Sequence, residues 1–450
     1  MTGLFIFVRV ILLKMHLSFK RILLLHICLF CLLNIKAQII SGPMLGYKTM
    51  REVAVWIQTE HAQEVIFQYR SIDGRSKWAY TSATTEEREA YTHTFIAKNL
   101  RPGTNYIYSI FVKDDQANAI KGKFSTQLLW QYRTDPPDFS FAFGSCAYLN
   151  DEMYDRPGEP YGKGNAIFNT IAQKESDFML WLGDNIYLRE ADIMSESGIN
   201  YRYTHMKSNP SLQTLWKKMH HYAIWDDHDY GPNDADRSFI NKEESLNAFN
   251  RFWANPSQHP AKVGGITSMF SYNDLDFFLL DNRYNRSPNE RKGTQRQILG
   301  DAQIEWLIDA LVSSKASFKI VAVGGQFLSP AAVYENHATF PEERKKLLKL
   351  IEDEGIQNLI FLSGDRHKTE LTEMEFDNGT VLYDYTSSPL TSTAYDTSDE
   401  GNTIRVKGTH VSTQNFGMIE VSGPISERKL LLKAFDEGGN LLWKHSINKQ

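Results

Sequence analysis

The residues from Trp225 to Asp234, written WDDHDYGPND, hold many side chains of the types that bind metals. Four aspartates, one histidine and one asparagine fall within these ten residues, directly after an apolar run (222–225) that is typical of the end of a buried strand. So many carboxylates at one strand end would repel one another unless a cation lay among them. A solvated acidic turn is the alternative interpretation, and the stretch by itself predicts a metal site.

Five further apolar segments end in glycine or aspartate, followed by residues of metal-binding or phosphate-binding types. They are 139–143 before GSC, 178–182 before GDNIY, 277–280 before DNR, 320–323 before GGQ, and 359–363 before GDRH. The carboxyl ends of strands in an α/β protein lie together, so these loops are expected to converge on one site. Apolar positions near helical spacing predict helices over 301–311 and 342–352.

Asp184 and Tyr187 follow one strand at a spacing of three residues, so a carboxylate and a phenol can address one ion from a single turn. A phenolate favours a ferric ion, whereas the surrounding oxygen ligands suit calcium, magnesium or manganese. A pair of metals needs a bridging carboxylate, and Asp184 is the candidate because its reach from the strand is shortest. Two metals a few ångströms apart can clamp a phosphoryl group and generate hydroxide at moderate pH.

Cysteine usage is compatible with the same centre. Two of the three cysteines, Cys28 and Cys31, lie within the first 37 residues, which leaves Cys146 alone in the rest of the chain. A lone thiol in an oxidising compartment is liable to oxidation. Cys146 is therefore expected to be either a buried inert side chain or a thiolate bound to a metal.

Residues 1–37 have the layout of a secretory signal peptide. From Met15, a short basic start with Lys20 and Arg21 precedes an apolar stretch over 22–33. That stretch is short for a membrane span, and the alternative, an uncleaved anchor over 4–33, is interrupted by basic residues. We expect a periplasmic or secreted protein with no stable membrane span after signal cleavage.

The balance of charged residues limits the kinds of partner that the protein could bind. Removal of the five basic residues in 1–37, which contains no acidic residue, lowers the formal net charge from −5 to −10. No basic patch stands out in the remainder, so we expect no nucleic-acid-binding groove.

Residues 38–133 predict a small all-β sandwich of the immunoglobulin or fibronectin III type. The segments 53–57, 65–69 and 91–96 are short, β-branched and aromatic, and polar turns separate them. The stretch LRPGTNYIY (100–108) resembles the tyrosine corner of such sandwiches. A proline-containing linker (135–138) then leads into a catalytic domain over 138–450.

Five motifs in order resemble the alkaline phosphatase D, or PhoD-like, family of the metallophosphatase superfamily: FGSC (143–146), WLGDNIY (181–187), WDDHDYGPND (225–234), LLDNRY (279–284) and LSGDRH (362–367). The resemblance covers essentially the whole mature chain. It implies an α/β (α+β) two-sheet metallophosphatase sandwich flanked by helices and preceded by a small all-β sandwich domain. It also implies an exported alkaline phosphatase or phosphodiesterase that binds ferric iron and calcium, with manganese, magnesium or zinc as substitutes.

The resemblance assigns roles around the first metal. It implies that Cys146 is a thiolate ligand to iron, that Asp184 bridges the metals, and that Tyr187 binds iron. Asp365 and His367 would each bind one of the two metals.

The resemblance also assigns residues to the second metal and to the phosphate. Asp227 would bind the second metal, and His228 would contact the phosphate or protonate the leaving oxygen. Asp227 and Asp365 stand where the wider superfamily has nitrogen ligands, which favours hard ions over a zinc pair. Asp226 and Asn233 are further candidate ligands. Arg283 and Arg366 could hold phosphate oxygens, and a structural ion pair is the alternative for Arg283.

The sequence thus predicts an exported, monomeric, metal-dependent phosphoesterase that hydrolyses a small phosphate monoester or diester through a metal-activated hydroxide. A phospholipase D-like lipid phosphodiesterase is an alternative with the same chemistry and a different pocket. A non-catalytic surface binding protein with a vestigial metal site is the other alternative, and the loss of a ligand would favour it. None of the expected ligands is missing from the motifs.

Overall fold

The computed structural model describes residues 38–256, 259–260, 262–292 and 295–450. The predicted signal peptide over 1–37 lies outside these residues. Residues Ile39–Gln450 form one compact unit. Within the described part of the chain, none of the helices combines the length and the apolar character needed to cross a bilayer.

The first of two large sheets has nine strands and contains the first three parallel strands of the motif pattern. In spatial order they are β19 (Leu441–Asn448), β18 (Lys429–Asp436), β17 (Asn415–Ser422), β8 (Phe139–Gly144), β9 (Phe178–Leu182), β10 (His220–Ile224), β1 (Ile39–Lys48), β2 (Val53–Thr59) and β5 (Thr92–Ala97). Strands β8, β9 and β10 pair in parallel, so their carboxyl ends lie at one edge of the sheet.

The second large sheet has six strands and contains the other three strands of the pattern. Its order is β11 (Ser268–Tyr272), β12 (Leu275–Leu279), β13 (Phe318–Val323), β14 (Leu359–Ser363), β16 (Val381–Thr386) and β15 (Glu370–Glu375). Strands β12, β13, β14 and β16 all pair in parallel. Strand β16 is a further parallel strand that the sequence pattern missed.

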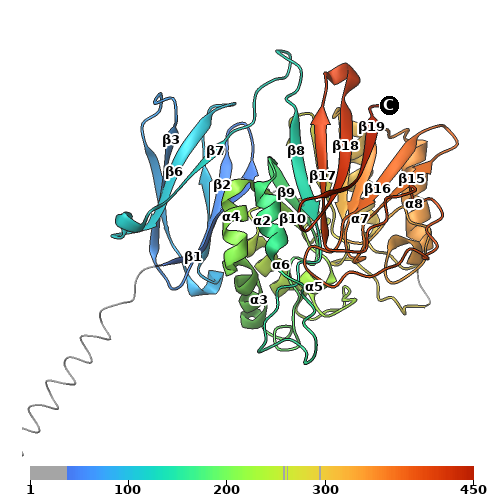
Figure 1. Ribbon diagram of the computed structural model, residues 1–450, viewed down its shortest axis with the longest axis horizontal. Helices are drawn as coiled ribbons and strands as arrows, with labels where there is room; N and C mark the ends of the chain where they lie inside the picture. Colours follow the sequence, from blue (N-terminus) through green and yellow to red (C-terminus); the bar gives the residue numbers. More distant parts are fainter. Residues whose placement is uncertain (1–37, 257–258, 261, 293–294) are drawn as a thin grey trace, which may run out of the picture. The chain divides into compact units, whose positions relative to one another are not determined.

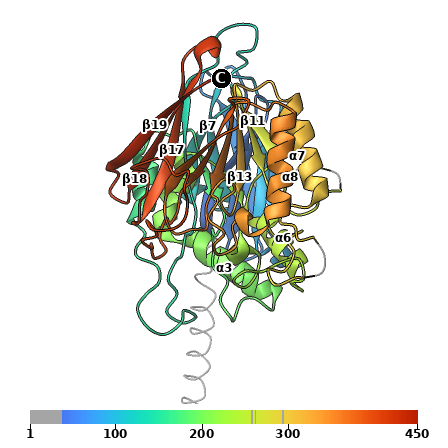
Figure 2. The same ribbon diagram turned by 90° about the vertical axis from the view of Figure 1, so that its right-hand side faces the viewer.

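Apolar side chains fill the space between the two sheets. The ring of Phe141 on β8 lies 4.9 Å from that of Phe178 on β9 and 5.3 Å from that of Phe277 on β12, measured between centroids. All three rings are buried. Figure 2 shows the two sheets edge on, with β17–β19 on one side of this core and β13 on the other. The predicted two-sheet sandwich is confirmed.

Helices cover the outer faces of both sheets. Helices α7 (Asp301–Ser313) and α8 (Pro341–Asp353) lie side by side on the six-stranded sheet (Figure 2) and confirm the two predicted helices. Their apolar faces, including Leu307 and Ile351, share a buried cluster with side chains of β12, β13 and β14. The remaining helices are α2 (Ala166–Gln173), α3 (Glu196–Ser208), α4 (Gln213–Lys218), α5 (Asp227–Tyr230) and α6 (Lys242–Phe252), several of which lie in front of the nine-stranded sheet in Figure 1.

The N-terminal strands form the expected sandwich, but they are shared with the large sheet. A four-stranded sheet, β4 (Ala79–Thr84), β3 (Glu64–Ser71), β6 (Asn105–Val112) and β7 (Ile120–Ser125), packs on β1, β2 and β5 (Figure 1). The Tyr106 hydroxyl accepts a hydrogen bond of 2.9 Å from the backbone N–H of Arg101, as in a tyrosine corner. Because β1 pairs with β10, this sandwich continues directly into the nine-stranded sheet, and the division at 133/138 stays a prediction.

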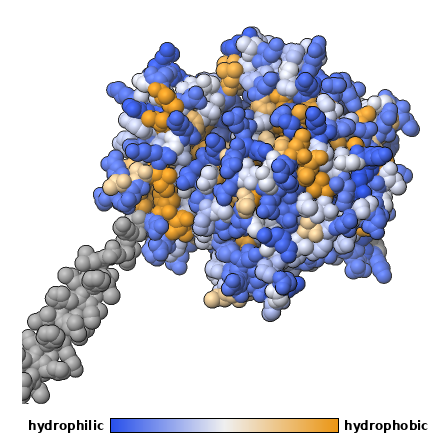
Figure 3. All heavy atoms as spheres, in the orientation of Figure 1, coloured by the Kyte–Doolittle hydropathy of each residue, from blue (hydrophilic) through white to orange (hydrophobic). Residues whose placement is uncertain are grey.

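The surface in the orientation of Figure 1 is mostly hydrophilic, with apolar side chains in small groups (Figure 3).

Arg428 fixes the linker against the hairpin β11–β12. The Arg428 guanidinium is buried and donates to both carboxylate oxygens of Asp274, at 3.0 and 2.9 Å, and to Asp138 at 2.8 Å.

Replacing Arg428 by methionine should lower the free energy of unfolding by about 3–5 kcal/mol, because the buried carboxylate of Asp274 loses its cation. Denaturant unfolding measures the change. The exposed pair Arg156–Glu190 provides a matched control, and Arg156→Met should cost less than about 1 kcal/mol. Equal losses in the two variants would contradict the role given to Arg428.

Candidate active site

In the part of the chain that the structure describes, residues that follow the parallel strands meet in four groups of side chains of metal-binding types. Within each group, one ligand atom from every residue lies within 4.8 Å of the others. The groups are Cys146–Asp184–His367, Asp184–Asp227–His228, Asp226–Asp227–Asp365 and Asp227–Asp234–Glu335. Asp184 belongs to the first two groups, which is the position that a bridging ligand requires. We call the residues of the first three groups, together with Tyr187, the metal cluster.

The first part of the metal cluster combines sulfur, oxygen and nitrogen. Cys146 Sγ lies 3.4 Å from Asp184 Oδ2, and the Tyr187 hydroxyl lies 3.4 Å from the same oxygen and 3.3 Å from His367 Nε2. His367 Nδ1 donates to the Thr393 carbonyl at 2.6 Å. That bond orients the ring and leaves Nε2 free to bind a cation, as in histidines that ligate metals.

The second part is almost entirely carboxylate. Asp226 and Asp227 begin α5 directly after β10, and Asp365 follows β14. The Asp227 carboxylate accepts a hydrogen bond of 2.8 Å from the backbone N–H of Asp234, and the Asp184 carboxylate accepts one of 3.3 Å from the backbone N–H of His228. Asp229, which sequence reasoning missed, anchors the turn by accepting from the backbone N–H groups of Asp226 and Asn185.

The backbone is strained at four of these residues. Cys146, Asp184, Asp365 and His367 have φ angles of 59°, 51°, 67° and 50°, in the left-handed region that costs a residue with a side chain about 1 kcal/mol or more. Each lies two to four residues beyond the end of its strand. The left-handed backbone thus occurs at residues whose side chains meet in the metal cluster, and strained backbone is concentrated at functional sites.

Burial and mutual repulsion dominate the electrostatics of the metal cluster. Burial raises the pKa of the Asp184 and Asp365 carboxyl groups well above the ordinary range, and neighbouring anions raise both further. Burial also raises the pKa of the Cys146 thiol. For Asp227, burial raises the pKa, but the charges of His228 and Arg283 outweigh it and hold the value at about 2. A cation among these groups would reverse the raised values and keep the ligands ionised.

The donor set fits such a cation. One carboxylate oxygen on each of Asp226, Asp227 and Asp365 is buried without a hydrogen-bond partner among the described residues, and these three residues form one of the groups above. Buried carboxylate oxygens without partners are costly, and a hard cation satisfies them. Gly324, at the end of β13, makes room, because a side chain there would begin 2.5 Å from Asp226 Oδ2.

The two predicted arginines lie in different places. Arg283 is buried and donates to Glu335 at 2.9 and 2.6 Å, and it also binds Asp226. Its guanidinium is therefore engaged in ion pairs, the alternative that the sequence left open. Arg366 lines the cavity above the metal cluster and pairs with Glu400 at 2.6 Å.

That cavity has a volume of about 470 Å³ and is lined by Asp184, Asp227, His228, Asp365 and His367. Asn233 also lines it, and its side-chain amide nitrogen donates to Asp234 at 2.8 Å, so its role as a ligand stays a prediction. A volume of this size is typical of small-molecule sites.

Two serines that sequence reasoning missed complete the surroundings. Ser388 Oγ donates to Cys146 Sγ at 3.1 Å, and Ser392 Oγ lies 3.1 Å from the Tyr187 hydroxyl. Both lie beyond β16, the parallel strand that was also missed. The alternating segment 381–386, followed by small polar residues, is the pattern that could have indicated them.

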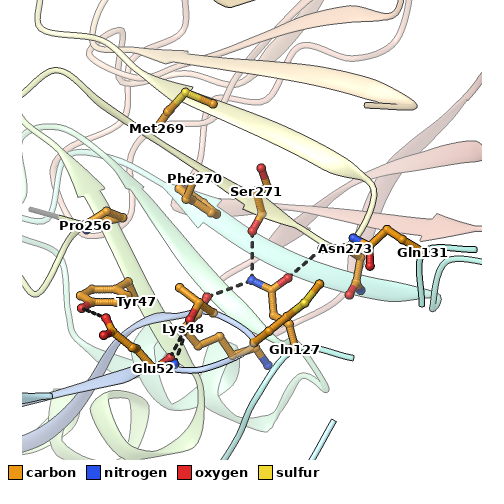
Figure 4. A pocket seen from close by; sticks show the side chains of 12 residues that line it. Tyr47, Lys48, Glu52, Gln127, Gln131, Pro256, Met269, Phe270, Ser271 and Asn273 are labelled. Carbon is orange, nitrogen blue, oxygen red and sulfur yellow. Dashed lines mark hydrogen bonds between the residues drawn. The ribbon is translucent and has the colours of Figure 1, made fainter. Parts of the chain in front are cut away.

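A second cavity, of about 360 Å³, lies beside the N-terminal sandwich (Figure 4). The Gln127 amide spans it, donating to the carbonyls of Lys48 and Ser271 and accepting from the backbone N–H of Asn273. None of the described residues that line this second cavity is a predicted metal ligand. The chemistry of the metal cluster therefore belongs to the first cavity.

Comparison with solved structures defines the class of fold. The chain superposes on a structure of PhoD with a TM-score of 0.73 and 16% identity, over 93% of this chain and 94% of that one. It also superposes on purple acid phosphatase PPD1 from yellow lupin seeds, with a TM-score of 0.66 and 14% identity, over 90% of this chain and 74% of that one. The fold is that of the metallophosphatases.

Sequence comparison then identifies the family. The model of the PhoD-like phosphatase family matches residues 141–424, and this chain belongs to that family. Alkaline phosphatase D of Bacillus subtilis (strain 168) is 22% identical over 290 residues, which are 54% of this chain and 48% of that protein. The match thus spans about half the length of that relative.

Proposed function

We propose that the protein is an exported, metal-dependent phosphoesterase that hydrolyses small phosphate monoesters or diesters. The observation that carries the proposal is the sharing of Asp184 between two adjacent groups of ligand-type side chains at the base of one cavity. Family membership and the metallophosphatase fold support the same reaction class.

The two parts of the metal cluster suit different ions. Cys146, Asp184, Tyr187 and His367 would hold a ferric ion, since thiolate and phenolate are strong anionic donors. Asp226, Asp227 and Asp365, with Asp184 shared, would hold a hard ion such as calcium. When bound, such a pair of cations would activate water and polarise the phosphoryl oxygens.

The protein side chains would orient the ester and handle the proton. Arg366 and His228 line the cavity, so a phosphoryl group bound there would lie near the Arg366 guanidinium and the His228 imidazole. Arg283 would act below the cavity by positioning Asp226. Burial lowers the pKa of the His228 imidazole below its ordinary value, although the charge of Asp227 opposes the shift. Histidine is the side chain that most often transfers protons in catalysis, which supports a proton-transfer role for His228.

Replacing His228 by asparagine should slow hydrolysis to a degree that depends on the leaving group. If His228 protonates the leaving oxygen, kcat should fall about 10³-fold for an alkyl phosphate and only about tenfold for 4-nitrophenyl phosphate, which needs little protonation. Steady-state kinetics on both esters measures the effect. An equal loss on both esters would contradict the proton-transfer role.

The location and the substrate class belong to the same proposal. The signal-like layout of 1–37 and the lone Cys146 support export to the periplasm or the medium. Hydrolysis assays with a phosphate monoester, a diester and a phospholipid would separate the proposal from its lipid-directed alternative. Absence of hydrolysis by the metal-loaded protein on all three would favour a binding protein.

A further inference from the structure

The cavity above the metal cluster has an aromatic rim that phosphoryl chemistry alone does not require. Tyr334 and Tyr395 line this cavity, and they come from two loops that are far apart in the sequence. Their side chains are 76% and 48% exposed. Burial of an aromatic ring stabilises proteins and complexes strongly, so two exposed rings at the mouth of a cavity are available to contact a ligand.

Tyr334 is held at the rim by its neighbours. Its φ angle is 50°, a left-handed conformation that a bulky residue rarely adopts without a constraint. The Arg366 guanidinium lies over its ring, 4.2 Å from the centroid, and Glu400 holds that guanidinium through the 2.6 Å ion pair. The guanidinium thus covers part of the ring, while most of the side chain stays exposed.

Tyr395 lies directly against the metal cluster. Its ring stacks on that of His367, with centroids 5.5 Å apart and an interplanar angle of 24°. Its backbone N–H donates to the His367 carbonyl at 3.1 Å. A group that contacts Tyr395 therefore lies next to a residue proposed to bind a cation.

We propose that Tyr334 and Tyr395 form a stacking site for a planar ring in the organic part of the substrate. The protein would then favour phosphate esters that carry an aromatic or heteroaromatic ring over saturated esters of the same size. This inference rests on the proposed function, because the metal cluster and Arg366 would hold the phosphoryl group beside the rim. A pair of aromatic rings contributes binding free energy beyond that of the apolar area it buries. That extra free energy corresponds to a preference of about threefold to tenfold in Kd.

The test compares two non-hydrolysable ligands and inorganic phosphate. Isothermal titration calorimetry on the metal-loaded full chain measures the Kd of phenylphosphonate, of cyclohexylphosphonate and of phosphate. Phenylphosphonate should bind about threefold to tenfold more tightly than cyclohexylphosphonate. In the double variant Tyr334→Leu/Tyr395→Leu that ratio should approach one. Both phosphonates use the same phosphoryl site, so any effect of the variant on Arg366 or His367 should cancel in the ratio.

Two control variants separate stacking from other effects. Tyr334→Phe keeps the ring and should keep the ratio, and Tyr132→Leu replaces a fully exposed tyrosine that does not line the cavity and should also keep it. A ratio near one in the unmodified protein, or an unchanged ratio in the double variant, would overturn the stacking site. If phosphate itself fails to bind, the proposed function fails together with the inference, whereas phosphate binding with a ratio near one removes the inference alone.

Discussion

Replacing Asp184 by asparagine should lower kcat for phosphate-ester hydrolysis about 10³-fold, equivalent to about 4 kcal/mol of transition-state stabilisation. Among the described residues, Asp184 is the one shared by the group that contains Cys146 and the group that contains Asp227 and His228. An amide has nearly the same shape as a carboxylate, but it lacks the charge needed to join two cations. The loss should therefore exceed that expected from the removal of a single hydrogen bond.

Kinetics and elemental analysis of the same purified variant measure this effect. Metal content should fall together with activity. Asp276→Asn is a suitable control, because Asp276 lies on β12 outside the cavity lining and its carboxylate accepts from Ser271 and Ser314. Undiminished activity in Asp184→Asn would remove this residue from the bridging role.

Replacing Cys146 by serine should lower the iron content of the purified protein and abolish any thiolate-to-iron absorption band, with a loss of activity of about 10²-fold or more. Serine is nearly isosteric, but its hydroxyl is a far weaker anionic donor than a thiolate. Cys146 is fully buried 3.4 Å from Asp184, so a change there acts directly on the metal cluster.

Ser388→Ala provides the matched comparison, since it removes the hydrogen bond to Cys146 Sγ and keeps the thiol. That variant should shift the absorption band and retain most of the iron. Unchanged iron content in Cys146→Ser would mean that the cysteine is an inert buried side chain, the other interpretation left open by the sequence.

The sequence identified the elements of the site because strand ends are local patterns. Each predicted strand is an apolar run that stops at glycine or aspartate, and the parallel pairing of β8–β10 and of β12–β14 brings those ends together. The alternation of strands and helices indicated an α/β protein, and the two-sheet architecture was implied by the resemblance of the five motifs to the PhoD-like family. Strand β16 escaped notice because the residues after it, among them Ser388 and Ser392, carry no charge of the kind that marked the other strand ends.

Other features depend on contacts between distant segments and could not be predicted locally. The ion pair of Arg283 with Glu335 joins residues that are 52 positions apart, and no sequence pattern near Arg283 predicts Glu335 as its partner. The same holds for the pairing of β1 with β10, which merges the N-terminal sandwich with the large sheet. The left-handed backbone at Asp184 and Asp365 is imposed by tertiary packing, since aspartate has only a modest preference for it.

We propose that Asp184 lies between two cations held by residues that follow separate strands. Anomalous diffraction from crystals of the metal-loaded protein, recorded on both sides of the iron absorption edge, would locate both ions. We expect an iron peak within bonding distance of Cys146, Asp184 and His367, and a second cation between Asp184 and Asp227. Metal peaks elsewhere, or a metal-loaded protein with no cation between these side chains, would contradict the proposal.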